Sequence, residues 1–224
     1  MKRYPLLVFD WDGTLVDSIE RIVSSLQFAS KKTLNADISA AQAKDVIGLG
    51  LIEAVEKLHP ELDAKKHASK LNNVADAYRQ HYLYQNTVAA PLFTGVNTLL
   101  DELRDEGYTL AISTGKSRRG LEHSINEHKV ADYFVTTRCA GENKSKPHPE
   151  MLHEILHELN FTAAEALMIG DSAHDLLMAN NANMSCIGVT HGVHDAATLG
   201  KYNPLTCLSN ITELSAYLNH NNAL

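Results

Sequence analysis

Two carboxylates stand two residues apart after an apolar run, where they could perform acid–base or nucleophilic chemistry. Asp10 and Asp12 follow Leu6–Phe9 in the segment DWDGTLVDS, and Gly13 allows the backbone to turn sharply. Along an extended chain both side chains would point to one side, but a turn that begins after Asp10 can aim Asp12 differently. One carboxylate could then attack while the other moves protons. The pair alone is explained equally well as a solvated turn.

Two further segments carry groups that could hold a phosphoryl oxygen. Thr114 and Gly115 end a second apolar run, so a hydroxyl and backbone N–H groups are available there. A helix N-cap explains the Thr-Gly turn as well, and Ser117 also suits that role. Lys146 stands directly before a proline, where a stiffened loop could aim its ammonium group at a bound phosphate and at Asp10. A single loop lysine is ordinarily exposed to solvent.

A second acidic pair suits a metal ion. Asp171 follows another apolar run, and Asp175 comes one helical turn later in the segment GDSAHD, so both carboxylates can face one cation. Hard oxygen ligands are typical of Mg²⁺ sites. A helix cap with an acid in the first turn, favoured by the helix dipole, would explain the same segment.

The runs before these residues are predicted to be strands of one parallel sheet. Short apolar runs separated by helical stretches indicate alternating strands and helices. The runs cover residues 6–9, 109–114, 134–137, 166–170 and 184–189, and helices over 96–103 and 151–159 have the apolar spacing of sheet-covering helices. The predicted fold class is therefore α/β, a Rossmann-like parallel sheet with helices on both faces. Ligands bind at the carboxyl ends of such strands, where the candidate side chains stand.

A long connection between the first two predicted strands indicates an inserted unit. It contains far more residues than an ordinary crossover needs. Residues 16–88 show no convincing strand but three or four helical stretches, including 51–58 and 63–85. We therefore expect an all-helical cap domain over 16–88 and a core domain formed by 1–15 and 89–224.

Composition and charge narrow the class of protein. The 224 residues carry 27 acidic and 20 basic side chains, a formal net charge of -7, without a run of lysine and arginine that could follow a nucleic-acid backbone. Nucleic acid is therefore not expected as a partner, and an anionic substrate would need local cations, backbone N–H groups or metal. Three widely spaced cysteines fit buried thiols of a reducing compartment. No stretch suits a signal peptide or a membrane span, so we expect a cytoplasmic protein without a membrane partner.

The four candidate segments together resemble the four sequence motifs of the haloacid dehalogenase superfamily, and the chain most resembles its phosphoglycolate phosphatase-like branch. DWDGTLVDS, STGK, KPHPEM and GDSAHD match these motifs in order, and the resemblance covers nearly the whole chain. It implies an enzyme that forms an aspartyl phosphate on Asp10, with Asp12 as general acid and then general base. It also implies that Thr114, Gly115 and Lys146 hold the phosphoryl group.

The resemblance implies Mg²⁺ as the cofactor and a cap loop that faces the active site. The metal would be bound by the Asp10 carboxylate, the Asp12 backbone carbonyl and Asp171, with Asp175 either a ligand or a water-mediated partner. The segment DVIGLGL resembles the cap loop, so Gly48, Leu49 and Gly50 are candidate substrate contacts. A turn between two cap helices would explain these glycines equally well.

Several functions stay open at this point. A dehalogenase lacks a second acid two residues after the nucleophile, so Asp12 favours phosphate esters. The expected substrate is a small phosphorylated metabolite such as phosphoglycolate, but a sugar-phosphate mutase, a nucleotide phosphatase and a pyrophosphatase remain alternatives. A phosphate-binding interaction module would be expected to lack a motif residue, and none is missing. His191 and His194 in THGVH are expected to have no metal-binding role. Both a monomer and a homodimer are compatible with the sequence.

Overall fold

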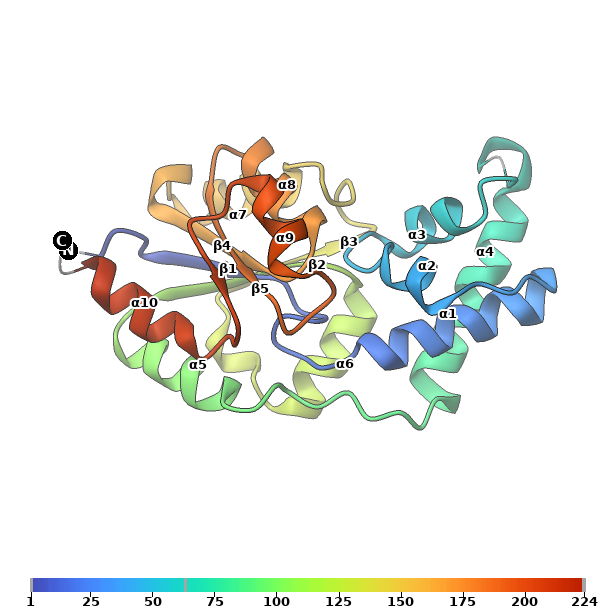
Figure 1. Cartoon of the computed structure of the whole chain (residues 1–224), viewed down its shortest axis with the longest axis horizontal. Helices are drawn as coiled ribbons and strands as arrows, with labels where there is room; N and C mark the ends of the chain where they lie inside the picture. Colours follow the sequence, from blue (N-terminus) through green and yellow to red (C-terminus); the bar gives the residue numbers. More distant parts are fainter. Residues whose placement is uncertain (1, 63, 223–224) are drawn as a thin grey trace.

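Six parallel strands form the sheet of the computed structural model, which describes residues 2–62 and 64–222 (Figure 1). The strand order is β3-β2-β1-β4-β5-β6, with β1 in the middle. Leu6 of β1 lies opposite Thr109 of β2 on one side and Ala166 of β4 on the other. The strands are β1 (Leu6–Phe9), β2 (Thr109–Ser117), β3 (Thr136–Ala140), β4 (Ala166–Gly170), β5 (Ser185–Val189) and β6 (Cys207–Leu208).

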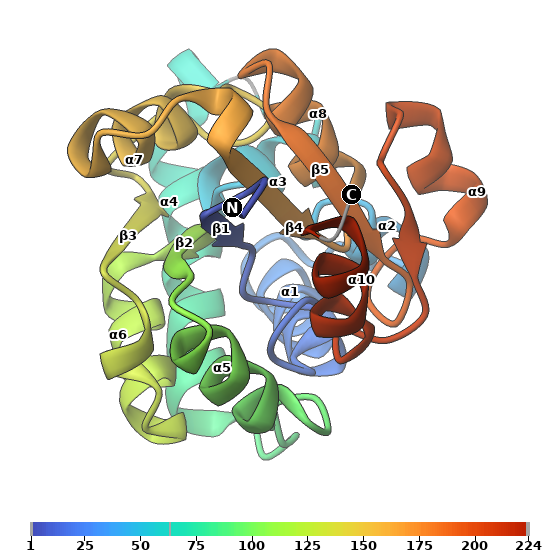
Figure 2. The same cartoon turned by 90° about the vertical axis from the view of Figure 1, so that its left-hand side faces the viewer.

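Helices alternate with the strands and cover both faces of the sheet, as predicted (Figures 1 and 2). They are α5 (Val96–Asp105), α6 (Arg118–His128), α7 (Glu150–Leu159), α8 (Ala173–Asn181), α9 (Ala196–Leu199) and α10 (Glu213–Asn222), with short 3₁₀ helices at Ala131–Tyr133, Ala163–Glu165 and Gly200–Tyr202. Among the described residues, no helix combines the length and apolar character that crossing a membrane requires.

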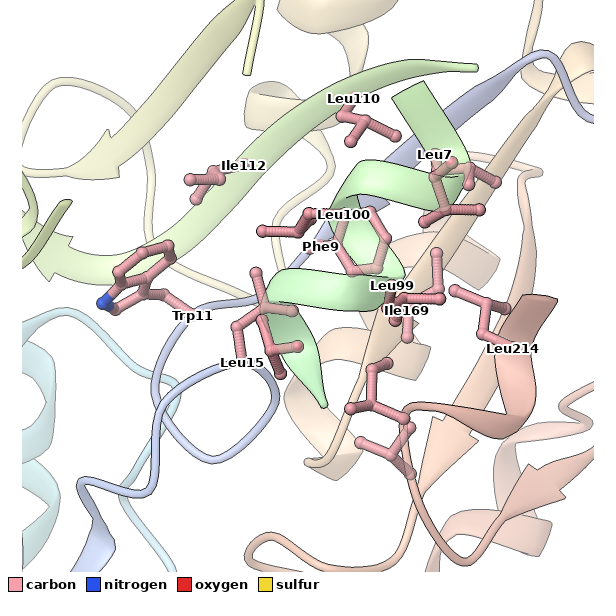
Figure 3. Packing of buried hydrophobic residues seen from close by; sticks show 14 of the residues in the cluster. Leu7, Phe9, Trp11, Leu15, Leu99, Leu100, Leu110, Ile112, Ile169 and Leu214 are labelled. Carbon is pink, nitrogen blue, oxygen red and sulfur yellow. The ribbon is translucent and has the colours of Figure 1, made fainter. Parts of the chain in front are cut away.

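The middle strand is apolar on both faces because each face is packed against helices. All four side chains of β1 are fully buried. Leu7 and Phe9 cluster with residues of α5, α6 and α10, whereas Leu6 and Val8 cluster with residues of α7 and α8. Successive side chains of a strand point to opposite faces, so a run without polar residues suits a strand covered on both sides. Figure 3 shows the cluster that contains Leu7 and Phe9, in which Leu100 lies beside Phe9.

Some strand boundaries differ from the prediction. The second strand continues to Ser117 instead of ending at position 114, and the fifth begins at Ser185, one residue later than predicted. The third spans Thr136–Ala140 instead of 134–137. It is an edge strand, half-covered and polar in part, so its apolar residues do not mark its bounds. Strand β6 was not predicted, because two residues are too few for a periodic pattern.

The connection between β1 and β2 is helical throughout its described elements. It contains α1 (Ile19–Leu34), α2 (Ala40–Lys44), α3 (Leu51–Leu58), α4 (Ala64–Gln80) and the π-helix η1 (His81–Gln85). Helix α3 has the predicted bounds, and the stretch predicted over 63–85 consists of α4 and η1, with Asp63 outside the described residues. We call α1 to η1 the helical insert. It has apolar clusters of its own and lies beside the sheet in Figure 1. The division into domains at 16 and 88 stays a prediction.

The chain enters and leaves the helical insert at one place. Val16 forms an antiparallel bridge with Leu92. The backbone N–H of Asp17 donates to the Pro91 carbonyl oxygen at 2.8 Å, and that of Phe93 donates to the Leu15 carbonyl oxygen at 3.0 Å. The two connections therefore run side by side, a few residues after the end of β1.

Candidate active site

Three neighbouring strands bring the predicted residues to one edge of the sheet. Asp10 follows β1, Thr114 lies in the last part of β2, and Asp171 follows β4. These strands are adjacent in the order β2-β1-β4, and because they are parallel their carboxyl ends meet at one edge. All three side chains are buried, with no more than 1% of their surface exposed. The sheet thus brings together residues that are far apart in the sequence.

A tight turn after Asp10 directs Asp12 to different partners. The Trp11 carbonyl oxygen accepts the backbone N–H of Val16 at 3.1 Å, and Gly13 adopts a φ of 85°, which favours glycine. A Cβ atom at Gly13 would lie 2.3 Å from Oδ2 of Asp171. Glycine is therefore required both for the turn and for the close approach of the Asp171 carboxylate.

Three buried carboxylates form a cluster at this edge. Each of Asp10, Asp171 and Asp175 offers an oxygen atom within 4.8 Å of the others. The Thr14 hydroxyl donates to Oδ1 of Asp171 at 2.8 Å. The backbone N–H and hydroxyl of Ser172 donate to Oδ2 of Asp175 at 3.0 and 2.6 Å, a capping box at the start of α8. The helix-cap explanation of this segment is therefore also correct, and the cap fixes one of the clustered carboxylates.

Lys146 is buried among these carboxylates instead of exposed. Its Nζ atom lies 2.7 Å from Oδ1 of Asp10 and 2.6 Å from Oδ1 of Asp175, and none of its side chain is exposed. Burial opposes the charge of Lys146, but attraction to the two carboxylates outweighs burial and raises the pKa of the ammonium group. The lysine is thus held as a cation next to Asp10.

The charge balance of the cluster favours a further cation. Burial, followed by repulsion from Asp175, raises the pKa of Asp10 to about 7, although Lys146 acts in the opposite direction. Burial and repulsion from Asp175 and Asp10 also raise the pKa of Asp171 well above its usual range. Three carboxylates face one ammonium group, so a divalent cation placed among them would stabilise their ionised forms.

The donor set fits Mg²⁺, the ion expected from the sequence. All the ligand atoms are carboxylate oxygens, the ligands that hard cations prefer. Oδ1 of Asp10 is buried, and Lys146 Nζ lies 2.7 Å from it. A carboxylate oxygen has more than one lone pair, so this atom could contact a cation in addition to Lys146.

Asp12 is held by a lysine that sequence reasoning missed. Lys116 Nζ lies 2.8 and 2.9 Å from the two carboxylate oxygens of Asp12, and the Ser18 hydroxyl donates to Oδ1 at 2.7 Å. Burial opposes the charge of Lys116, but Asp12 and neighbouring tyrosines outweigh it and raise the pKa of the ammonium group. The sequence could have indicated this lysine through its position, because Lys116 comes two residues after Thr114 at the same sheet edge.

Thr114 and Ser117 have separate roles at the end of β2. Ser117 is the N-cap of α6, and its hydroxyl accepts the backbone N–H of Gly120 at 3.3 Å. The Thr114 hydroxyl accepts the backbone N–H of Lys116 at 3.2 Å and lines a pocket with Asp10. The N-cap predicted for this segment therefore belongs to Ser117, and the Thr114 hydroxyl is left at the pocket.

The pocket lies between the sheet edge and the helical insert. The core contributes Asp10, Asp12, Thr114, Gly115, Lys116, Ser117 and Gly120, and the insert contributes mainly apolar and aromatic side chains, among them Ile22, Leu26, Val46, Tyr78 and Tyr82. Gly48 and Leu49 of the predicted cap loop also line it. Gly50 is outside the lining, and its backbone N–H donates to the Ser145 hydroxyl at 2.7 Å. The loop 48–50 thus lies against the core beside the pocket.

The THGVH histidines lie near the site but bond to the backbone. His191 Nε2 is 3.1 Å from the Thr14 carbonyl oxygen, and His194 Nδ1 accepts the backbone N–H of Ala173 at 3.0 Å. Neither belongs to the group of acidic residues that could hold a metal in the described part of the chain.

The chain is similar to known hydrolases along most of its length. Residues 7–189 match the family model of haloacid dehalogenase-like hydrolases. The chain is 29% identical over 210 residues to a phosphoglycolate phosphatase of Vibrio vulnificus, covering 89% of each protein. It is 29% identical over 218 residues to a 5'-nucleotidase of Pseudomonas aeruginosa, covering 96% of each.

A solved structure has the same fold along almost the whole chain. A haloacid dehalogenase-like hydrolase from Bacteroides fragilis superimposes with a TM-score of 0.85 at 27% identity, over 94% of this chain and 99% of that one. The matched residues include Asp10, Thr114 and Asp171. The chain therefore belongs to the haloacid dehalogenase-like hydrolases.

Proposed function

We propose that this protein is a Mg²⁺-dependent phosphatase that hydrolyses a small phosphate monoester through an aspartyl phosphate on Asp10. The observation that supports the proposal most strongly is the placement of the Asp10 carboxylate. It lies beside the Lys146 ammonium group, within a cluster of oxygen ligands, and lines a pocket that also contains Asp12. One bound phosphate could therefore meet a nucleophile, a fixed cation and a second acid. The carboxylate oxygens beside it could also bind a metal ion.

Asp10 and Asp12 share the chemistry of two half-reactions. In the first, an oxygen of Asp10 attacks phosphorus, the bond to the ester oxygen breaks, and Asp12 gives its proton to the departing oxygen. In the second, Asp12 takes a proton from water, the water oxygen attacks phosphorus, and the bond to Asp10 breaks to release phosphate. Splitting the transfer into two steps is the advantage of covalent catalysis, and one group can serve as acid and then as base.

The remaining groups offset the charge of the phosphate. Lys146 and the Thr114 hydroxyl would hold the phosphoryl oxygens, with backbone N–H groups near Gly115. The Asp10 and Asp171 carboxylates and the Asp12 backbone carbonyl would hold Mg²⁺, with Asp175 as a direct ligand or a water-mediated partner. The bound ion would reduce the repulsion between an anionic nucleophile and an anionic substrate.

The proposed substrate is a small phosphorylated metabolite that resembles phosphoglycolate, and the proposed location is the cytoplasm. The phosphoglycolate phosphatase among the relatives supports this choice. A nucleotide substrate is the second candidate, because a 5'-nucleotidase is equally similar and the insert side of the pocket is apolar and aromatic. A screen of phosphorylated metabolites, scored by kcat/KM with product analysis, separates these candidates from each other and from a mutase.

Metal dependence provides the direct test. We expect the purified protein to release 4-nitrophenol from 4-nitrophenyl phosphate in the presence of Mg²⁺, and to lose this activity in excess EDTA. Returning Mg²⁺ should restore the rate, because the three clustered carboxylates are poorly balanced by Lys146 alone. Absorbance of released 4-nitrophenol measures both states. Equal rates with and without chelator would exclude the proposed mechanism.

Replacing Gly115 by Ala should weaken catalysis by moving the loop 48–50. A Cβ atom at Gly115 would lie 2.4 Å from the Leu49 carbonyl oxygen and 2.5 Å from that of Gly48, so backbone must shift. A displacement of about 1 Å near a catalytic site can lower the rate about 10²-fold, and we expect a loss of that order in kcat/KM. Gly200→Ala is the control, because nothing lies within 4 Å of its Cβ and its φ is -57°. Equal activity of both variants would show that the contact between loop and core does not matter for turnover.

A further inference from the structure

Asp10 and Asp12 contact different ammonium groups. Lys116 contacts both oxygens of Asp12, whereas Lys146 contacts Asp10 and Asp175. The side chains of Lys116 and Asp12 are only 8% and 12% exposed. A carboxylate that is largely removed from water needs partners, and Lys116 is the charged partner of Asp12.

The helical insert supplies the group that holds Lys116. The Tyr82 hydroxyl accepts a hydrogen bond from Lys116 Nζ at 3.2 Å, and this Nζ atom lies 4.6 Å from the centre of the Tyr82 ring. Lys116 belongs to β2 of the core, and Tyr82 belongs to η1 of the insert. One ammonium group therefore connects the insert with Asp12.

Tyr82 is fixed in turn by α1. Arg21 donates from Nε and Nη2 to the Tyr82 carbonyl oxygen at 3.1 and 2.7 Å. Its guanidinium group lies 4.8 Å from the centre of the Tyr82 ring. Single π-helical turns are frequent at functional sites, and this one presents the tyrosine to the pocket. The ring and its hydroxyl therefore move with the insert as a whole.

We infer that Tyr82 and Lys116 are positioning residues for Asp12. When the insert lies over the core, Tyr82 holds Lys116 against Asp12, and Lys116 and the Ser18 hydroxyl fix the carboxylate in one orientation. The inference rests on the proposed function, in which Asp12 protonates the leaving group. If the insert moves away, Lys116 loses its tyrosine and Asp12 loses part of its support. Protonation of the leaving group therefore depends on the contact between the insert and the core.

Two aryl phosphates test this inference. The value of kcat/KM reports the steps up to departure of the leaving group; phenolate departs poorly without a proton, whereas 4-nitrophenolate departs well. Tyr82→Phe should lower kcat/KM for phenyl phosphate about tenfold and that for 4-nitrophenyl phosphate less than about twofold. Lys116→Met should lower the value for phenyl phosphate about 10²-fold, again with a much smaller effect on 4-nitrophenyl phosphate. A purely structural role would slow both substrates equally.

Tyr84→Phe is the matched control. Tyr84 lies two residues further along η1, is 61% exposed, and accepts a hydrogen bond from Arg119, so it too joins the insert to the core. We expect this variant to hydrolyse both substrates as the wild-type protein does.

The outcomes separate the inference from the proposed function. A wild-type protein without Mg²⁺-dependent hydrolysis would reject the proposed function itself. An active wild type in which Tyr82→Phe behaves like Tyr84→Phe, or in which both substrates slow equally, would overturn the positioning role alone. Tyr82→Phe removes a single hydroxyl and decides the matter even if Lys116→Met does not fold. Thermal unfolding followed by circular dichroism establishes which variants are folded.

Discussion

Asp10→Asn is expected to abolish phosphate release, lowering kcat by about 10⁴-fold or more. The amide has nearly the shape of the carboxylate but no anionic oxygen to attack phosphorus, and it also removes one charge from the cluster with Asp171 and Asp175. Steady-state release of phosphate measures the loss. Acid quenching of the wild-type reaction, followed by mass spectrometry, should in addition find a phosphoryl group on the peptide that contains Asp10.

Asp17→Asn is the matched control for this variant. Asp17 belongs to the same segment, DWDGTLVDS, but its side chain is exposed. The control should retain wild-type activity and metal dependence. Substantial turnover by Asp10→Asn, or a phosphoryl group on another residue, would assign the nucleophile elsewhere.

Lys146→Met is expected to remove activity and to destabilise the metal-free protein. Methionine conserves most of the volume, but it leaves Asp10, Asp171 and Asp175 without their buried cation. We expect kcat/KM to fall about 10³-fold, because a fixed positive charge at the phosphoryl group is lost. Uncompensated buried charge should lower the free energy of unfolding by about 3–5 kcal/mol, measured by urea denaturation in EDTA.

The pH dependence of this destabilisation has a defined sign. In the folded protein the pKa of Asp10 is raised to about 7, so the folded state binds more protons than the unfolded state between the ordinary carboxyl pKa and that value. Stability therefore falls as the pH rises through this window. Without Lys146 the pKa of Asp10 should rise further, and the loss of stability should be greater at pH 8 than at pH 6.

Lys144→Met is the control for Lys146→Met. Lys144 lies in the same loop, is 66% exposed and is 3.8 Å from a Glu150 oxygen, so its removal should change neither activity nor stability appreciably. Added Mg²⁺ should recover part of the stability lost in Lys146→Met, because it supplies charge to the same carboxylates. A Lys146→Met protein as stable in EDTA as the control would contradict the charge balance described for this cluster.

Local patterns were sufficient to predict the strands and the helix that carry Asp10, Asp171 and Asp175. The run Leu6–Phe9 reads as a strand because both of its faces are covered, and α3 has its predicted bounds because its apolar residues repeat at helical spacing. The placement of Asp10, Thr114 and Asp171 at one edge followed from parallel strand order. These features depend on neighbours within a few residues or on a general rule of α/β sheets.

The partners of Lys116 and the π-helix η1 were not predicted. Lys116 owes its role to Asp12, 104 positions away in the sequence, and to Tyr82, 34 positions away. No pattern around Lys116 distinguishes a buried ammonium group from an exposed one, because its counter-charge comes from another element. The π-helix η1 was merged with α4 in the prediction, since side-chain spacing over five residues does not separate the two kinds of helix. Such details follow from tertiary packing.

The bridge between Val16 and Leu92 bears on how readily the helical insert could be replaced. It holds the two ends of the insert next to each other, so the insert is a closed loop attached to the sheet at one place. The entropy of closing a loop grows only slowly with its length, so the insert could be lengthened, shortened or exchanged with little effect on the stability of the sheet. Exchanging the whole helical insert would change one side of the pocket and leave Asp10, Asp12 and Thr114 in place on the core.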